Sequence, residues 1–221
     1  MNNKEDMMIL LGFDRQCITP KLPVRLSGYA GERIANSVHD DLYTRCIAME
    51  YEGSRYLLAQ CDCLAVDEAL RGKVLSALSD LNIAEEHFIL LATHTHSGPA
   101  GTVDTSEEPF QSLQYIFGTP NPEYRSELAE KIALAAHLAF SDMLECKLTI
   151  GRGTIENVGT ERHDPKLPGD PSLLTLLFER TDGKKVLLYN YACHLTVLNP
   201  ANLFLTADLS YAVERLSLIH I

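Results

Sequence analysis

The sequence predicts an α/β domain in which a mixed β-sheet is flanked by helices. Three observations support this fold class. Strand-like apolar segments alternate with segments of helical spacing along the chain. Residues 87–93 are almost entirely apolar, which is typical of a strand buried on both faces in the middle of a sheet. No repeat, low-complexity segment or linker divides the 221 residues, so a single domain is expected, incomplete at its C-terminus.

The strands of this sheet are predicted from apolar or alternating runs. Seven segments qualify: 7–14, 42–51, 55–65, 87–93, 146–152, 172–179 and 185–193. Glu52-Gly53-Ser54 and Asp182-Gly183 each separate two consecutive strands and are typical of hairpin turns.

Two helices are predicted from apolar residues that recur every three or four positions. The first covers residues 67–81, with Asp67 as its candidate N-cap. The second covers residues 122–144, where Pro122 suits the first helical position. A loop is expected at 97–121, because glycine and proline recur through it.

The end of the chain suggests a boundary. A helix begins at Asp208 and ends within a few turns, and residues 217–221 look like a non-native tail. We therefore expect one partial catalytic domain over residues 1–216, followed by that tail at 217–221.

Composition narrows the class of protein. The chain is 46% hydrophobic and 22% charged, which is ordinary for a globular domain. Its net charge of −11 argues against nucleic-acid binding. No stretch approaches the roughly 18 apolar residues that span a bilayer, and no export signal is evident, so a cytoplasmic protein is expected. The six cysteines form no C-x-x-C pair and are expected to be free thiols.

The strongest chemical signal is the pair His94 and His96 in the segment ATHTHSGPAG (92–101). On a strand, residues two apart project to the same side, so the two imidazoles are expected side by side at a strand end. Open α/β sheets place ligand sites at such ends, and imidazole is a common zinc ligand. The glycine-rich turn that follows offers backbone N–H groups to a developing oxyanion.

His194 repeats this arrangement, because it follows the apolar strand predicted at 185–193. It is a candidate third imidazole for the same site. Spacing alone leaves open which two of the three histidines bind the metal and whether the remaining one only supports them. Asp62 and Asp208 also end apolar runs and are candidate hydrogen-bond partners for the imidazoles.

Four blocks together resemble the neutral, non-lysosomal ceramidase family, and we expect a bacterial relative. ATHTHSGPAG (92–101) resembles the family element A-T-H-T-H-S-G-P-G-G. LSGY (26–29) and VHDDLYTR (38–45) resemble its early glycine turn and its V-H-D-P-L-Y-A-R element. NYACH (190–194) with LTAD (205–208) resembles its N-x-x-x-H and S-A-D elements.

This resemblance implies a zinc-dependent amidase that acts on N-acylsphingosine or a related lipid amide. By motif position, His94 and His194 would bind the zinc ion, and His96 would hydrogen-bond the reacting groups. Gly28 would line the site through its backbone, and Arg162 lies where the family has a substrate-contacting arginine.

Two departures from the family pattern, Asp41 and Ala100, are compatible with the fold. The family's G-D-x-[SN]-P serine element and its glutamate and tyrosine metal ligands are expected beyond this chain, which leaves its own catalytic competence undecided. Two alternatives therefore stay open. One is a binuclear metallohydrolase of another substrate, and the other is a metal-binding fragment without catalysis.

Overall fold

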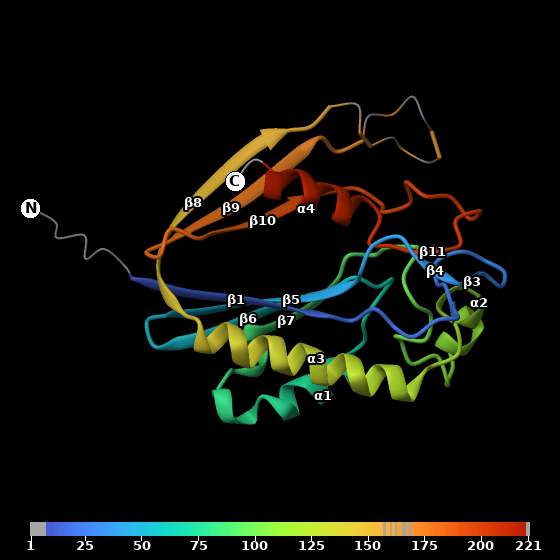
Figure 1. The fold of residues 1–221 in the computed structure, drawn as a ribbon, viewed down its shortest axis with the longest axis horizontal. Helices are drawn as coiled ribbons and strands as arrows, with labels where there is room; N and C mark the ends of the chain where they lie inside the picture. Colours follow the sequence, from blue (N-terminus) through green and yellow to red (C-terminus); the bar gives the residue numbers. More distant parts are fainter. Residues whose placement is uncertain are drawn as a thin grey trace, which may run out of the picture.

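The fold is built on one mixed sheet of seven strands, seen in a computed structural model (Figure 1). The structure describes residues 8–219 except 157, 160, 162, 165, 166 and 168, and the side chains only up to residue 216. In sheet order the strands are β10 (Lys185–Tyr191), β9 (Ser172–Arg180), β8 (Leu144–Thr154), β1 (Ile9–Cys17), β5 (Tyr43–Tyr51), β6 (Ser54–Cys61) and β7 (Phe88–Ala92). Only the β6–β7 pair within this sheet is parallel, which makes the sheet mixed as predicted.

All seven predicted strands are present, and both predicted hairpins are confirmed. β5 pairs with β6 across Glu52 and Gly53, and β9 pairs with β10 across Asp182 and Gly183. The predicted position of residues 87–93 is wrong. β7 is an edge strand rather than a central one, and on one face its side chains Ile89 and Leu91 are 52% and 41% exposed.

The two predicted helices form, with Asp67 as N-cap and Pro122 in the first turn as predicted. In α1 (Glu68–Ala77), the Asp67 side chain accepts a hydrogen bond from the Leu70 N–H at 2.8 Å. In α3 (Pro122–Ser141), the proline occupies the first turn and Asn121 is the N-cap. The predicted loop at 97–121 also contains the short helix α2 (Gln114–Phe117), and the last helix is α4 (Leu209–Ile219). None of the described helices combines the length and the apolar character needed to cross a membrane.

Helices and sheet enclose two apolar cores. α1 and α3 cover one face of the β1–β5–β6 part of the sheet, and α4 lies on the side of the β8–β10 arm (Figure 1). The larger core joins the two helices to the sheet through residues such as Leu57, Val74 and Ile132. The smaller one lies between the two parts of the bent sheet and centres on Leu11, Ile47 and Phe178. The described cysteines are all free, as expected, and three of them are buried: Cys46, Cys61 and Cys63.

Short strand pairs bring distant segments to one end of the sheet. β2 (Val24–Arg25) pairs with β3 (Ile34–Ala35), and β4 (Ser37–Val38) pairs with β11 (Phe204–Leu205). A single bridge also joins Leu26 to Pro99. These pairings bring the segments around residues 26–38, 95–99 and 204–208 together beside the carboxyl end of β7.

Candidate metal centre

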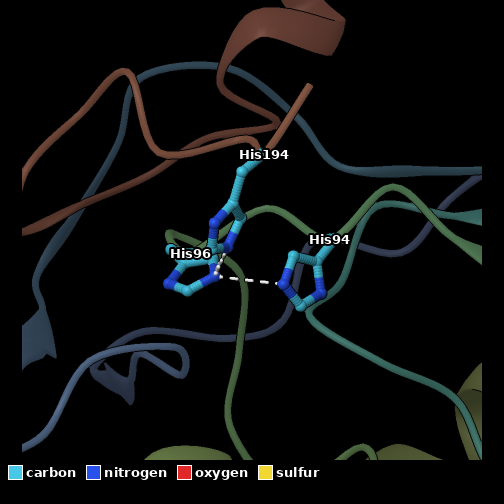
Figure 2. Close-up of side chains that lie close together, drawn as sticks. All are labelled: His94, His96 and His194. Carbon is cyan, nitrogen blue, oxygen red and sulfur yellow. Dashed lines mark hydrogen bonds between the residues drawn. The ribbon is translucent and has the colours of Figure 1, made fainter. Parts of the chain in front are cut away.

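Three imidazoles meet at this end of the sheet. His94, His96 and His194 each offer one ring nitrogen, and these nitrogens lie within 4.8 Å of one another. Figure 2 shows the three rings turned toward a common point. The Nε2 atoms of His94 and His96 are 3.3 Å apart, and those of His96 and His194 are 2.8 Å apart. We refer to these three residues as the histidine cluster, and their arrangement could hold a metal ion.

A hydrogen bond to the backbone orients the His94 ring and selects the tautomer that a metal ligand needs. Nδ1 of His94 lies 2.7 Å from the Leu64 carbonyl oxygen, which can only accept a hydrogen bond, so Nδ1 carries the proton. In this tautomer the Nε2 atom of His94 keeps its lone pair and directs it at the cluster. A backbone carbonyl that orients the far nitrogen is a common feature of histidine ligands in metal sites.

His94 and His96 do not lie side by side for the predicted reason. β7 ends at Ala92, and His94 has a left-handed backbone with φ of 65°. The two residues belong to the turn that follows the strand, so strand alternation does not orient them. The turn is held by Thr95, whose hydroxyl donates to the Thr206 carbonyl at 2.9 Å and accepts from the Ser97 N–H at 3.2 Å.

His96 is the buried member of the cluster, at 7% exposure, whereas His94 and His194 are exposed. Burial, together with the neighbouring imidazoles of His94 and His194, lowers the pKa of His96 to about 4. His96 is therefore neutral at pH 7 and retains a lone pair on one ring nitrogen. Its Nε2 atom and that of His194, 2.8 Å apart, are within hydrogen-bonding distance.

Gly28, which the sequence predicts to line the site, lies against the His96 ring. Its φ is +100°, and a Cβ built there would lie 2.5 Å from both Cγ and Nδ1 of His96. Its N–H donates to the Ile116 carbonyl at 3.0 Å. Gly28 therefore leaves room for the His96 ring, and its amide is used in a backbone hydrogen bond rather than in a contact with the cluster.

We expect Gly28→Ala to destabilise the protein by about 2–4 kcal/mol, because it combines left-handed strain with overlap on a buried ring. Gly31→Ala is the matched control: Gly31 has φ of +96°, and a Cβ there would meet no described atom within 4 Å. That substitution adds strain alone, about 1 kcal/mol. Urea unfolding of the two variants compares them, and equal losses would show that the His96 contact is unimportant.

The expected oxyanion role of the glycine-rich turn meets a structural obstacle. The Ala100 N–H donates to the Arg25 carbonyl, and the Gly101 N–H donates to the Phe117 carbonyl, both at 2.8 Å. The Ser97 N–H is likewise bonded, to the Thr95 hydroxyl. These three amides maintain the turn and are not directed at a reacting atom.

The two candidate aspartates support the backbone around the cluster. Asp208 accepts from the Leu198 N–H at 3.1 Å and so holds the loop that follows His194. Asp62 accepts from the Tyr43 N–H at 2.9 Å and pairs with Arg45 at 2.8 Å. Their hydrogen bonds go to backbone amides and to an arginine rather than to the imidazoles. Arg162, the predicted substrate contact, lies outside the described residues.

Sequence reasoning missed two residues that shape the cluster. The Tyr29 ring meets the His96 ring edge-on at 4.9 Å, and its hydroxyl donates to the Leu198 carbonyl at 3.0 Å. The buried Arg33 side chain donates to the carbonyl of His96 at 2.6 Å. Tyr29 could have been found, because it belongs to the LSGY block that resembles a family motif. Arg33 lies outside every such block, so no sequence pattern pointed to it.

Comparisons with known proteins agree with this fold. The model of the family described as "Neutral/alkaline non-lysosomal ceramidase, N-terminal" matches residues 10–215. The solved structure of neutral ceramidase from Pseudomonas aeruginosa superimposes with a TM-score of 0.79 at 22% identity, over 92% of this chain and 34% of that chain. A second structure, of a ceramidase complexed with C2, gives 0.76 at 21% identity, over 91% and 34%. The chain thus spans about a third of the length of the solved structures that it matches.

Proposed function

Because this chain belongs to the neutral/alkaline non-lysosomal ceramidase family, we propose that its histidine cluster binds a zinc ion that serves the hydrolysis of a lipid amide. N-acylsphingosine is the proposed substrate class. The family match covers residues 10–215, which include all three histidines. The convergence of these histidines is the observation that carries the proposal.

The donor set fits zinc. Zinc is commonly bound by imidazole nitrogens at about 2.0–2.1 Å, so two nitrogens on one tetrahedral ion lie about 3.3–3.4 Å apart. The His94 and His96 Nε2 atoms are 3.3 Å apart, whereas those of His96 and His194, at 2.8 Å, are closer than two ligands of one tetrahedral ion. A single ion is favoured over a pair, because the cluster consists of three imidazoles and binuclear sites use carboxylates as well.

The proposal also specifies which of the three imidazoles bind the zinc ion. The family pattern assigns the ion to His94 and His194 and leaves His96 to hydrogen-bond the reacting groups. The lone pair of His94 and the exposure of His194 favour these two, while His96 lies deeper against Gly28. His96, which burial keeps neutral, would then donate or accept a hydrogen bond without adding a positive charge beside the ion.

Bound zinc would polarise the amide carbonyl and lower the pKa of a nucleophile. The chain's own residues would orient and hold the imidazoles. Leu64 fixes the His94 ring through its carbonyl, and Asp208 fixes the loop behind His194. The net charge of −11 suits an uncharged lipid amide better than an anionic substrate.

The proposal is tested by zinc titration of the purified, chelator-treated chain, followed by elemental analysis after dialysis. We expect one zinc per chain, removable by chelator and restored by added zinc. Release of sphingosine from a short-chain N-acylsphingosine is then measured with and without zinc. A chain that takes up no zinc would contradict the proposal, and zinc uptake without hydrolysis would favour the metal-binding alternative.

A further inference from the structure

Among the residues that the structure describes, Arg33 is a buried guanidinium without an acidic partner. Only 6% of the Arg33 surface is exposed to solvent. The buried Arg180 and the partly buried Arg45 each pair with two carboxylates. Arg33 donates to backbone carbonyls instead. Because burying an unpaired charge is costly, these contacts need an explanation other than general stability.

The three carbonyls belong to three segments that surround the histidine cluster. Nη2 of Arg33 donates to the Ser27 carbonyl at 2.5 Å and to the His96 carbonyl at 2.6 Å. Nη1 donates to the Asn202 carbonyl at 3.3 Å. Ser27 precedes Gly28, and Asn202 lies in the loop between His194 and β11. One planar group thus links the segments that carry Gly28, His96 and His194.

The guanidinium face makes a second connection to the same segments. It lies 4.7 Å from the centre of the Tyr29 ring. That ring contacts His96 edge-on at 4.9 Å, and its hydroxyl donates to Leu198, in the loop after His194. The N–H groups and the planar face of the Arg33 guanidinium therefore both connect His96 with the loop that follows His194.

We propose that Arg33 is a positioning residue of the metal centre, which sets the separation of His96 and His194 by holding three backbone segments together. The planar fork of arginine fixes the directions of its N–H groups, so it can set the relative placement of several acceptors at once. A lysine ammonium lacks this fixed geometry. The inference rests on the proposed function, because it assigns Arg33 to the same metal site.

The test compares Arg33→Met with Arg33→Lys and with the control Arg180→Met. The Arg180 side chain is also buried, but it lies at the opposite end of the β9–β10 hairpin from His194. Zinc affinity is measured by competition with a chromophoric chelator, and the cobalt-substituted protein reports ligand geometry through its visible spectrum. Nitrogen-15 spectra of the imidazoles in metal-free protein provide a readout that needs no metal.

We expect Arg33→Met to weaken zinc binding by about 10–100-fold, the range found when groups that orient metal ligands are removed. Its cobalt spectrum and its His96 and His194 imidazole resonances should change, with partial recovery in Arg33→Lys. Arg180→Met should leave all three readouts as in the parent. If Arg33→Met does not fold, Arg33→Lys decides by the same criteria.

Two outcomes separate this inference from the proposed function. A parent chain that binds no zinc contradicts the function, and the metal-free imidazole spectra then still decide whether Arg33 positions the rings. Zinc affinity within about twofold of the parent and unchanged imidazole resonances in the Arg33 variants would overturn the inference, as would equal changes in Arg180→Met.

Discussion

Replacing His94 or His194 by alanine is expected to weaken zinc binding at least 100-fold. Total zinc binding energies of about 10–16 kcal/mol, shared among four ligands, give about 3 kcal/mol for each ligand. Each substitution removes one of three convergent nitrogens. In the described chain, these histidines form the one group of at least three possible ligand side chains that could hold an ion. Isothermal titration and elemental analysis of the variants measure the loss.

His137→Ala is the matched control, because this histidine lies on α3 and hydrogen-bonds Asp80 at 3.1 Å, away from the cluster. Its zinc affinity should equal that of the parent. His96→Ala distinguishes the two assignments of the cluster. A loss as large as that of His94→Ala would place His96 on the ion, and a much smaller one would leave it as a hydrogen-bonding neighbour. Retention of full affinity in His94→Ala would contradict the site itself.

Gly12→Ala is expected to produce the largest loss of stability, about 3–4 kcal/mol, because the new side chain has no room between strand and helix. Gly12 lies on β1, at the point where α3 packs against the sheet. A Cβ there would lie 1.8 Å from the Ala139 carbonyl oxygen and 3.1 Å from Cγ of Met143. The overlap is with backbone, so α3 must move away from the sheet and open the larger core.

Gly72→Ala is the control for this prediction. Gly72 lies inside α1, and a Cβ there would meet no described atom within 4 Å. Because glycine is unfavourable in a helix interior, the change should stabilise the protein by about 0.5–1 kcal/mol. Urea unfolding of the two variants should therefore give shifts of opposite sign. A Gly12→Ala variant as stable as the parent would show that α3 does not pack so closely on β1.

The elements of the fold were accessible from the sequence because their signals are local. Alternation and helical spacing depend on neighbours within a few residues, and so do the hairpin turn at Asp182-Gly183 and the cap at Asp67. The position of β7 was not accessible in this way. An apolar run indicates a strand, but it does not show whether both faces are covered or whether a second strand or an open edge lies beside it.

The candidate site, too, was predictable from the sequence only in its local features. The sequence by itself determined that His94, His96 and His194 follow apolar strands, and its motifs predicted that Gly28 lines the site. Only the tertiary structure decided that His194 meets His96 across 98 residues, that Leu64 fixes the His94 ring, and that Arg33 links three segments. Contacts of this kind join residues far apart in the chain. They depend on sheet order and loop packing, for which a single sequence carries no local pattern.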